Sequence, residues 1–479
     1  MIDPDKTDGS GFKKRLNLFD STSIVIGSMI GSGIFIVSAD ISRTVGSPGW
    51  LMVVWILTGL MTVFAALSYG ELAGMMPNAG GQYVYLREAF SPLVGFLYGW
   101  TLFLVIQTGT IAAVAMAFGK FIGVLFPWVS EGNVFFKLGF IKFSSVHLLA
   151  ISSILLLSYI NTLGISIGKW LQNIFTVAKV GILIAFIFIG LFLARNIQAV
   201  DINHSIFWDA QKIQNGISVK LIGMSLIAGL ATSMVGSLFS SDSWNNITFA
   251  AGEIINPKKN IPLSLFLGTV TVTVLYLLTN FVYIQSLPLR GSPNGTTVVE
   301  RGIEFAIYDR LGTASMSGIL GTSAGLIMAA LVVISTFGCN NGLILSGARV
   351  YFAMARDALF FKKVGELNLN KVPSKALILQ GIWASILCIS GTYSNLLDYV
   401  MIAVLVFYVV TIIGIFVLRK KKPLENRPYK AFGYPVVPAI YIVMALFIII
   451  SLIILKSEYT WPGLIIVLLG IPVYYLWKK

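Results

Sequence analysis

Residues 27–35 read GSMIGSGIF and residues 236–246 read GSLFSSDSWNN, and each of these stretches interrupts a long apolar segment. Gly loses backbone entropy in a helix, and Ser, Asp and Asn compete for backbone hydrogen bonds. Both stretches therefore disfavour a continuous helix. Small residues such as Gly27 and Gly31 also allow close helix packing, which is the more common use of one such stretch alone.

The segments around these two stretches are long and uncharged. The chain has 479 residues, of which 56% are hydrophobic and 11% are charged, whereas a soluble domain carries about 25% charged residues. Asp, Glu, Lys and Arg are absent from residues 44–70, 89–119, 260–289 and 311–348. Each of these runs exceeds the roughly 20 residues that cross a bilayer. The composition therefore excludes a water-soluble protein.

The apolar pattern predicts an all-α integral membrane protein with twelve transmembrane helices. Segments of this length must satisfy their own backbone hydrogen bonds in lipid, which favours helices over the short alternating strands of a barrel. The spans are expected near residues 20–43, 48–76, 91–127, 145–163, 168–195, 221–252, 261–287, 313–356, 375–391, 394–418, 435–456 and 460–477.

Basic residues between the spans predict the orientation. Most of the 34 Lys and Arg residues fall on the same side as the N-terminus, as in the run from Arg419 to Lys422. Positive charge marks the inner side of a membrane, so both termini are expected in the cytoplasm. The same scatter between spans argues against nucleic-acid binding, despite a net charge of +14. The first span is expected to be an uncleaved anchor.

The two interrupted spans are the first and the sixth, and this placement indicates a binding site. In an inverted-repeat transporter, broken helices at corresponding positions of two five-helix halves form the substrate site. Free N–H groups near residues 31–33 would attract a carboxylate, and carbonyls near residues 28–29 and 239–240 would accept hydrogen bonds from an ammonium group. A zwitterionic amino acid fits both ends.

Several motifs also resemble one transporter family. Residues 31–35, GSGIF, resemble the helix-one signature of the amino acid–polyamine–organocation superfamily. Residues 239–245 resemble the helix-six motif of its L-type amino acid transporter branch, and residues 172–179 and 337–342 are similar to helices five and eight of that branch. The resemblance covers nearly the whole chain from about residue 14. It implies broken helices 1 and 6 in a LeuT-like 5+5 inverted repeat, with two extra helices.

The implied organisation has four parts. Residues 1–15 form a cytoplasmic N-terminal segment, residues 16–195 the first repeat, residues 196–418 the second repeat, and residues 419–479 a basic cytoplasmic loop with the last two spans. Heteromeric animal members of the family link to a glycoprotein through a cysteine between spans three and four, and this chain has none there. A stand-alone protein of the bacterial inner membrane, with no disulfide-linked subunit, is therefore expected.

The substrate is expected to bind at the two interruptions. Phe239 is either a gate over the ligand or aromatic packing, and the resemblance favours the gate. Asp242 is either a proton carrier or, preferably, the cap of the half-helix that follows. Asn245 contacts either the substrate or another helix. Cys339 and Asn341 lie on a span that either faces the site or packs against other helices, and they are interpreted, preferably, as packing residues. The expected substrate-binding residues are Ser28, Met29, Ile30, Gly31, Ser32, Gly33, Phe239, Ser240, Ser241, Asp242 and Asn245.

Lys179 is the most informative charge, because it lies in the middle of an otherwise apolar span. A charge at that depth is costly and indicates function. The resemblance implies that this helix-five lysine takes the place of a sodium ion between helices one and eight. Lys120, in contrast, lies near a span end and can reach water. His147 and His204 are isolated, so no metal site is expected, and nothing indicates a cofactor.

These features predict a secondary amino acid transporter of the plasma membrane. Zinc-protease and nucleotide-binding motifs are absent, so no catalytic residues are expected. Ser240, Ser241 and Ser243 leave room for a side chain, which favours a sodium-independent exchanger of neutral amino acids. The alternatives are a proton-coupled symporter that uses Lys179 or Asp242 and, from another class, a receptor or channel. The expected partners are an amino acid and the lipid bilayer.

Overall fold

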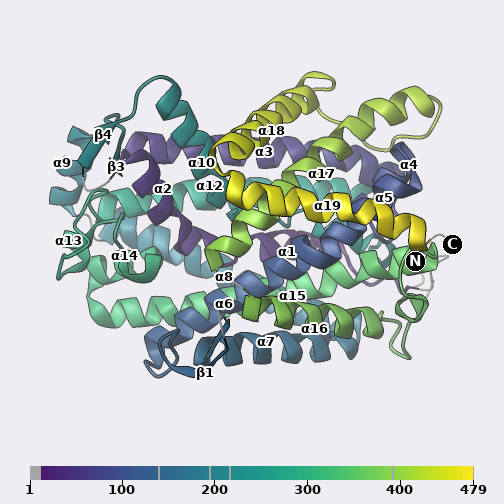
Figure 1. The fold of residues 1–479 in the computed structure, drawn as a ribbon, viewed down its shortest axis with the longest axis horizontal. Coiled ribbons are helices and arrows are strands. Elements are labelled where there is room, and N and C mark those ends of the chain that lie inside the picture. The colour runs from purple at the N-terminus through teal and green to yellow at the C-terminus, as the bar shows by residue number, and fades with distance from the viewer. Residues whose placement is uncertain (1–11, 139–140, 194–195, 215–216, 391–392, 478–479) are drawn as a thin grey trace.

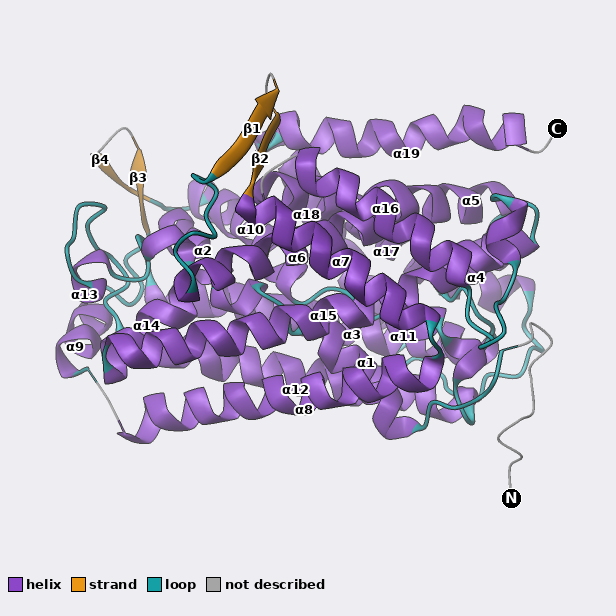
Figure 2. Ribbon diagram, turned by 90° about the horizontal axis from the view of Figure 1, so that it is seen from below, coloured by secondary structure: helices purple, strands orange, loops and turns teal. Residues whose placement is uncertain are grey.

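The computed structural model of the chain describes residues 12–138, 141–193, 196–214, 217–390 and 393–477. Its long helices lie side by side and form an elongated bundle (Figure 1, Figure 2). Both termini lie at one end of this bundle, which we name the terminal end. The hairpin of β3 (Gln211–Gln214) and β4 (Ile217–Lys220) lies at the other end, which we name the opposite end.

Ten helices in the described part of the chain are long and apolar enough to cross a membrane, and each overlaps a segment that the sequence predicts as a span. Two further predicted segments, 221–252 and 375–391, contain the shorter apolar helices α10 (Met224–Ser240) and α16 (Ser374–Ser390). The ten are Leu18–Phe35, Pro48–Met75, Pro92–Leu125, Ser145–Thr162, Ile165–Phe192, Pro257–Ser286, Thr322–Arg356, Val400–Lys421, Val436–Leu455 and Thr460–Trp477.

Local signals set where several helices begin. Asn17 caps α1 (Leu18–Met29), because its side chain accepts a hydrogen bond from the N–H of Asp20 while the Asp20 carboxylate accepts one from the N–H of Asn17. Three helices begin with a proline, whose missing N–H costs nothing at a first position: α3 (Pro48–Met75), α5 (Pro92–Thr101) and α12 (Pro257–Ser286). The other helices near the site are α2 (Val37–Val45), α4 (Gln82–Ala89), α6 (Gln107–Leu125), α7 (Ser145–Thr162), α8 (Ile165–Phe188), α17 (Tyr393–Lys421), α18 (Val436–Leu455) and α19 (Ser457–Trp477).

Two features differ from the sequence prediction. The single span expected over 313–356 consists of α14 (Leu311–Leu320) and α15 (Thr322–Arg356), separated by Gly321 at a φ of 85° that glycine tolerates. The connections also contain regular structure that the apolar pattern does not indicate. These elements are β1 (Val134–Leu138), β2 (Ile141–Ser144), the β3–β4 hairpin, α9 (Ile197–Ser205) and α13 (Val298–Arg301).

Both interrupted segments lie inside the bundle. α1 packs against α8, α12 and α15, and α10 packs against α2, α3, α17 and α18. The packing therefore surrounds the polar stretches of α1 and α10 with other helices instead of exposing them to lipid.

Candidate functional site

The first interruption separates α1 from the short 3₁₀ turn η1 (Gly33–Phe35). α1 ends at Met29, and Ile30 is extended, with φ −77° and ψ 92°. Gly31 and Gly33 are buried, and no described residue accepts a hydrogen bond from the backbone N–H of either. The interruption therefore presents two backbone donors that lack a protein partner.

The second interruption follows α10. That helix ends at Ser240, and helical structure resumes with the short α11 (Asn246–Phe249). Between them Ser243 has a φ of 68°, which is uncommon for a residue with a side chain. Phe239, at the last turn of α10, is 7% exposed, and Ser241 is buried as well. The whole connection therefore lies in the protein interior.

The two interruptions meet at a single tyrosine. The hydroxyl of Tyr276, on α12, lies 3.0 Å from the carbonyl oxygen of Met29 and 3.1 Å from that of Ser240. A Cβ at Gly33 would lie 2.1 Å from Ser240 Oγ, so only glycine permits this approach. Tyr276 was not predicted as part of the site, because nothing in the local sequence distinguishes it from other tyrosines in apolar helices.

Lys179, on α8, binds the first interruption. Its Nζ donates to the carbonyl oxygens of Gly27 at 2.9 Å and Ile30 at 2.8 Å, and the side chain is almost fully buried. Ser335 Oγ, on α15, donates to the same Ile30 carbonyl at 3.3 Å. In transporters with broken helices, unwound carbonyls of this kind coordinate the coupling cation. The ammonium group of Lys179 occupies such a position.

Two residues of α15 that were interpreted as packing residues differ from each other. Cys339 Sγ donates to the carbonyl of Ser28 at 3.1 Å, and a Cβ at Gly31 would lie 3.0 Å from this sulfur. Cys339 therefore forms one wall of the first interruption, which corrects its interpretation as packing alone. Asn341 instead donates to Gln172 Oε1 at 2.9 Å, within the contact of α15 with α8.

Asp242 and Asn245 connect the second interruption to neighbouring helices. The Asp242 carboxylate accepts a 2.5 Å hydrogen bond from the hydroxyl of Tyr408, on α17. α11 has no side-chain cap, so the expectation that Asp242 caps this half-helix is wrong. Asn245 donates to Gln82 Oε1 at 2.9 Å, and Gln82 in turn donates to Thr411 Oγ1 at 3.0 Å. Of the two interpretations of Asn245, contact with another helix is the one observed.

The carbonyl groups expected to receive an ammonium group already have donors. Cys339 donates to Ser28, and Tyr276 donates to Met29 and Ser240. The two cavities beside Asp242 have volumes of about 10 Å³ each, roughly the space of one water molecule. A larger ligand therefore requires the interruptions to move apart.

A buried ion pair closes the site toward the terminal end. Arg349, on α15, donates to both carboxylate oxygens of Glu253 at 3.1 and 3.0 Å, and both side chains are 1% exposed. The backbone N–H groups of Arg15 and Leu16 donate to the carbonyl of Glu253 at 2.9 Å. This connection ties the segment before α1 to the segment that follows the second interruption.

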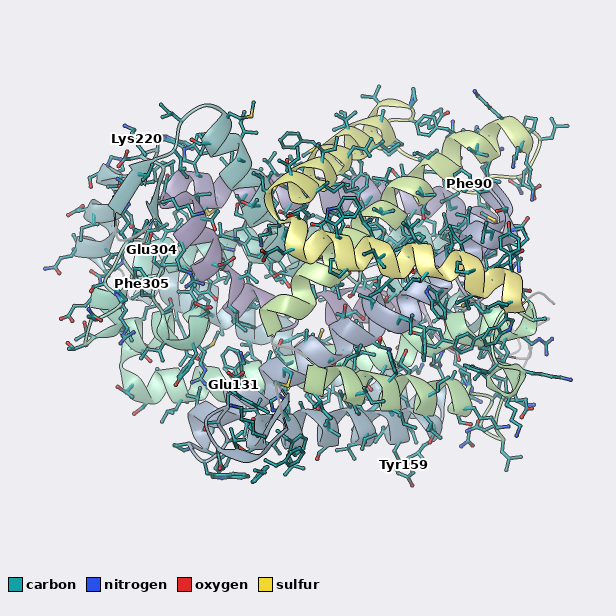
Figure 3. All side chains as sticks on the ribbon, viewed as in Figure 1. Phe90, Glu131, Tyr159, Lys220, Glu304 and Phe305 are labelled. Atoms are coloured by element: carbon teal, nitrogen blue, oxygen red, sulfur yellow. The ribbon has the colours of Figure 1, made fainter. Side chains whose placement is uncertain are left out.

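The opposite end is held by more exposed charges. Arg43 donates to Asp309 Oδ1 and to the backbone carbonyl of Glu304, both at 2.7 Å. Figure 3 labels Glu304 and Lys220 at this end of the bundle. Burial raises the pKa of the Glu304 carboxyl to about 7, and the positive charges of Arg290 and Arg43 offset this effect only in part.

The remaining candidate charges have ordinary roles. Lys120 pairs with Glu131 at 3.0 Å near the end of its helix, in keeping with the prediction that it reaches the surface. Within the described residues, no group of three or more His, Cys, Asp or Glu side chains is arranged to hold a metal ion. Both cysteines of the chain, Cys339 and Cys388, are buried free thiols.

Three known transporters are similar to this chain over nearly its whole length. The b(0,+)-type amino acid transporter 1 of Mus musculus is 28% identical over 472 residues, which cover 98% of this chain and 88% of the relative. The large neutral amino acids transporter small subunit 2 of Homo sapiens is 30% identical, with 98% and 81% covered. The serine/threonine exchanger SteT of Bacillus subtilis (strain 168) is 27% identical, with 99% of each chain covered.

The amino acid permease family matches residues 16–474, a range that includes both interruptions, Lys179 and all the predicted spans except the last three residues of the twelfth. Because this match covers almost the entire sequence, the chain belongs to the amino acid permease family, whose members are membrane transporters and not enzymes.

Proposed function

We propose that this permease exchanges neutral amino acids across the plasma membrane, independently of sodium, by alternating access. The observation that carries the proposal is the junction of the two interruptions. There the N–H groups of Gly31 and Gly33, which no described residue binds, belong to the same junction as the carbonyls of Met29 and Ser240, which Tyr276 binds here and which a ligand would take over once the interruptions move apart. Such N–H groups attract a carboxylate, and such carbonyls accept hydrogen bonds from an ammonium group. The junction thus suits the backbone that all amino acids share.

The proposed architecture has twelve spans in a LeuT-like 5+5 inverted repeat. The repeats are residues 16–195 and 196–418, and residues 419–479 supply a basic loop and two more spans. Interruptions in the first and sixth spans support this assignment. The terminal end, with residues 1–15, faces the cytoplasm of a bacterial cell. The distribution of basic residues and the full-length similarity to a Bacillus subtilis protein support this orientation and location.

Lys179 supports the sodium independence. Its ammonium group already binds the carbonyls of Gly27 and Ile30 that a coupling cation would need. A sodium ion at the same place would be repelled by the lysine charge. No disulfide-linked subunit is proposed, and the burial of both cysteines of the chain supports this.

The side chain of the substrate is proposed to be neutral. Ser240 and Ser241 are small, and the Asp242 carboxylate is engaged by Tyr408. Phe239 is proposed as the gate, because it lies on the last turn of α10 directly before the interruption. The relatives named for large neutral amino acids and for serine and threonine support a neutral substrate.

The proposal is tested by uptake of labelled amino acids into proteoliposomes. Serine, alanine and leucine are supplied outside, with and without unlabelled amino acid inside, under imposed sodium or pH gradients. Exchange predicts strong stimulation by internal amino acid and no effect of sodium. Stronger competition by lysine than by leucine would contradict the neutral assignment, and absence of amino acid uptake would contradict the function itself.

A proton-coupled symporter is the second candidate, and Asp242 is the observation that favours it. This buried carboxylate is hydrogen-bonded to a neutral tyrosine, and no ion pair to it is seen among the described residues. A buried carboxylate without a cation partner can carry a proton through a transport cycle. Uptake driven by a pH gradient without internal amino acid, and lost in Asp242→Asn, would select this candidate.

A further inference from the structure

A cavity of about 630 Å³ opens at the terminal end, and none of the residues that line it belongs to either interruption. Its walls come from the segment before α1, the connection between α3 and α4, the start of α12 and the end of α15. The volume lies within the range of pockets that bind small molecules. Nothing in the proposed transport function assigns a ligand to this space.

The charges that line the cavity are strongly unbalanced. Five basic residues and one acidic residue line it. The acidic residue, Asp357, is already occupied, because it accepts hydrogen bonds from Arg87 and from the hydroxyl of Tyr83. The other four basic residues make no ion pair with any described residue: Lys14, Lys258, Lys259 and Arg356.

The basic residues that line the cavity come from four parts of the chain: the segment before α1, α4, the start of α12 and the end of α15. Phe12 is fully buried, and its ring centroid lies 4.9 Å from that of Phe352, which fixes the segment that carries Lys14. Lys258 and Lys259 lie in the first turn of α12, where the helix dipole adds to their positive charge. An anion between these groups would hold the segment before α1 close to α12.

We propose that this cavity binds a phosphate-bearing anion. Several phosphate oxygens can accept hydrogen bonds from different lysines and an arginine at once, which is how proteins neutralise a cluster of this kind. The anion is either a soluble phosphate compound or the headgroup of an acidic phospholipid. The inference goes beyond the amino acid site and uses the proposed function only for placing the terminal end in the cytoplasm.

The test compares two double variants with the same change of charge. Lys258→Ala/Lys259→Ala removes two cavity lysines, and Lys362→Ala/Lys363→Ala removes two lysines that do not line the cavity. Binding of inorganic pyrophosphate to the purified protein is measured by calorimetry in an uncharged detergent. The Kd is expected to rise at least about tenfold in the cavity variant, and to change less than about twofold in the control. Arg356→Gln provides a second, single-site cavity variant.

A second measurement, made with lipids, distinguishes a phospholipid headgroup from a soluble phosphate compound. Thermal unfolding is measured in nanodiscs of phosphatidylcholine with and without phosphatidylglycerol. Stabilisation by phosphatidylglycerol that only the cavity variants lose assigns the headgroup, whereas selective loss of pyrophosphate binding assigns a soluble anion. The proposal is overturned if cavity and control variants behave alike in both arms, or if the wild type responds to neither probe. Amino acid uptake by the same variants reports separately on the transport function.

Discussion

The two interruptions meet at Tyr276 but are fastened to different helices by different chemistry. The first is bound by the ammonium group of Lys179 on α8 and by Cys339 on α15. The second is bound through the Asp242–Tyr408 contact to α17 and through Asn245 to α4. Apart from Tyr276, which bonds to both, the two interruptions are thus held by separate side chains on separate helices.

The two attachments also differ in strength. The Lys179 ammonium is a full charge that donates to two backbone carbonyls, and hydrogen bonds from a charged donor are roughly twice as strong as neutral ones. On the second side, Asn245 is held by a neutral amide contact, and the Asp242 carboxylate accepts a single side-chain hydrogen bond, from Tyr408, among the described residues. We therefore expect mutations on the first side to affect transport more than mutations on the second.

The largest effect is expected where the two sides touch. Gly33→Val places a branched side chain where a Cβ alone would lie 2.1 Å from Ser240 Oγ, so the interruptions must separate. Binding of alanine and leucine by the purified variant, measured by calorimetry, should fall below detection. Gly181→Val is the control, because nothing lies within 4 Å of a Cβ there. Unchanged affinity in a folded Gly33→Val protein would show that the junction is not the binding site.

The next largest effect is expected at Lys179. Lys179→Ala removes the cation from the first interruption, which should slow exchange by more than about tenfold, or roughly 1.4 kcal/mol. Transport is measured with substrate supplied separately on each face, and the change should appear first on the terminal-end face. Lys120→Ala, which loses only a partly exposed pair with Glu131, is the control. Wild-type rates and affinities on both faces would make Lys179 a tolerated buried charge.

Tyr276→Phe tests the contact that the two sides share. The variant loses hydrogen bonds to both Met29 and Ser240, so the free energy of unfolding should fall by about 1–3 kcal/mol. Denaturant unfolding in detergent provides the measurement. Tyr351→Phe is the control, because the Tyr351 hydroxyl is buried and no described residue forms a hydrogen bond with it. Equal losses in the two variants would mean that Tyr276 contributes only through packing.

The smallest effect is expected from a change of pH, because the group that titrates, Glu304, lies outside both interruptions. Because burial raises the Glu304 pKa from 4.5 to about 7, the folded protein holds a proton that the unfolded chain releases between these values. The contribution of Glu304 to the free energy of unfolding is therefore fully present below pH 4.5 and is lost as the pH rises through about 7. Glu304→Gln should flatten the change of Tm from pH 5 to pH 8, with a gain on the order of 1 kcal/mol at pH 8. A pH profile identical to that of the wild type would contradict this origin.

Much of the fold was accessible from sequence because the spans are long and nearly free of charge. The predicted starts of α3 and α7 are the observed ones, at residues 48 and 145. The separation of α14 from α15 was missed, since the apolar pattern continues through Gly321 and only the backbone conformation marks the change. The hairpins were missed because their strands of four or five residues carry too little pattern to stand out.

Site residues could be predicted from the sequence where a residue differs clearly from its apolar neighbours. Lys179 and the glycines of the first interruption are conspicuous in apolar surroundings. The contacts made by Tyr276 and Tyr408 were not accessible, because each joins residues more than 30 positions apart and neither tyrosine is unusual where it stands. The mistaken role for Asp242 has the same cause, since a local cap was preferred to a partner 166 residues away.

The position of Cys339 allows opening of the first interruption to be followed in the wild-type protein, without an added probe. Its thiol lies against the Ser28 carbonyl, and Cys388, the only other thiol, is buried beside Ala112. An alkylating reagent needs an accessible thiolate, so Cys339 can react only while the first interruption has moved away from α15. The alkylation rate of Cys339, followed by mass spectrometry, therefore counts these openings in the wild-type chain. Any cysteine introduced at an exposed position becomes the single readily labelled thiol without prior removal of native ones.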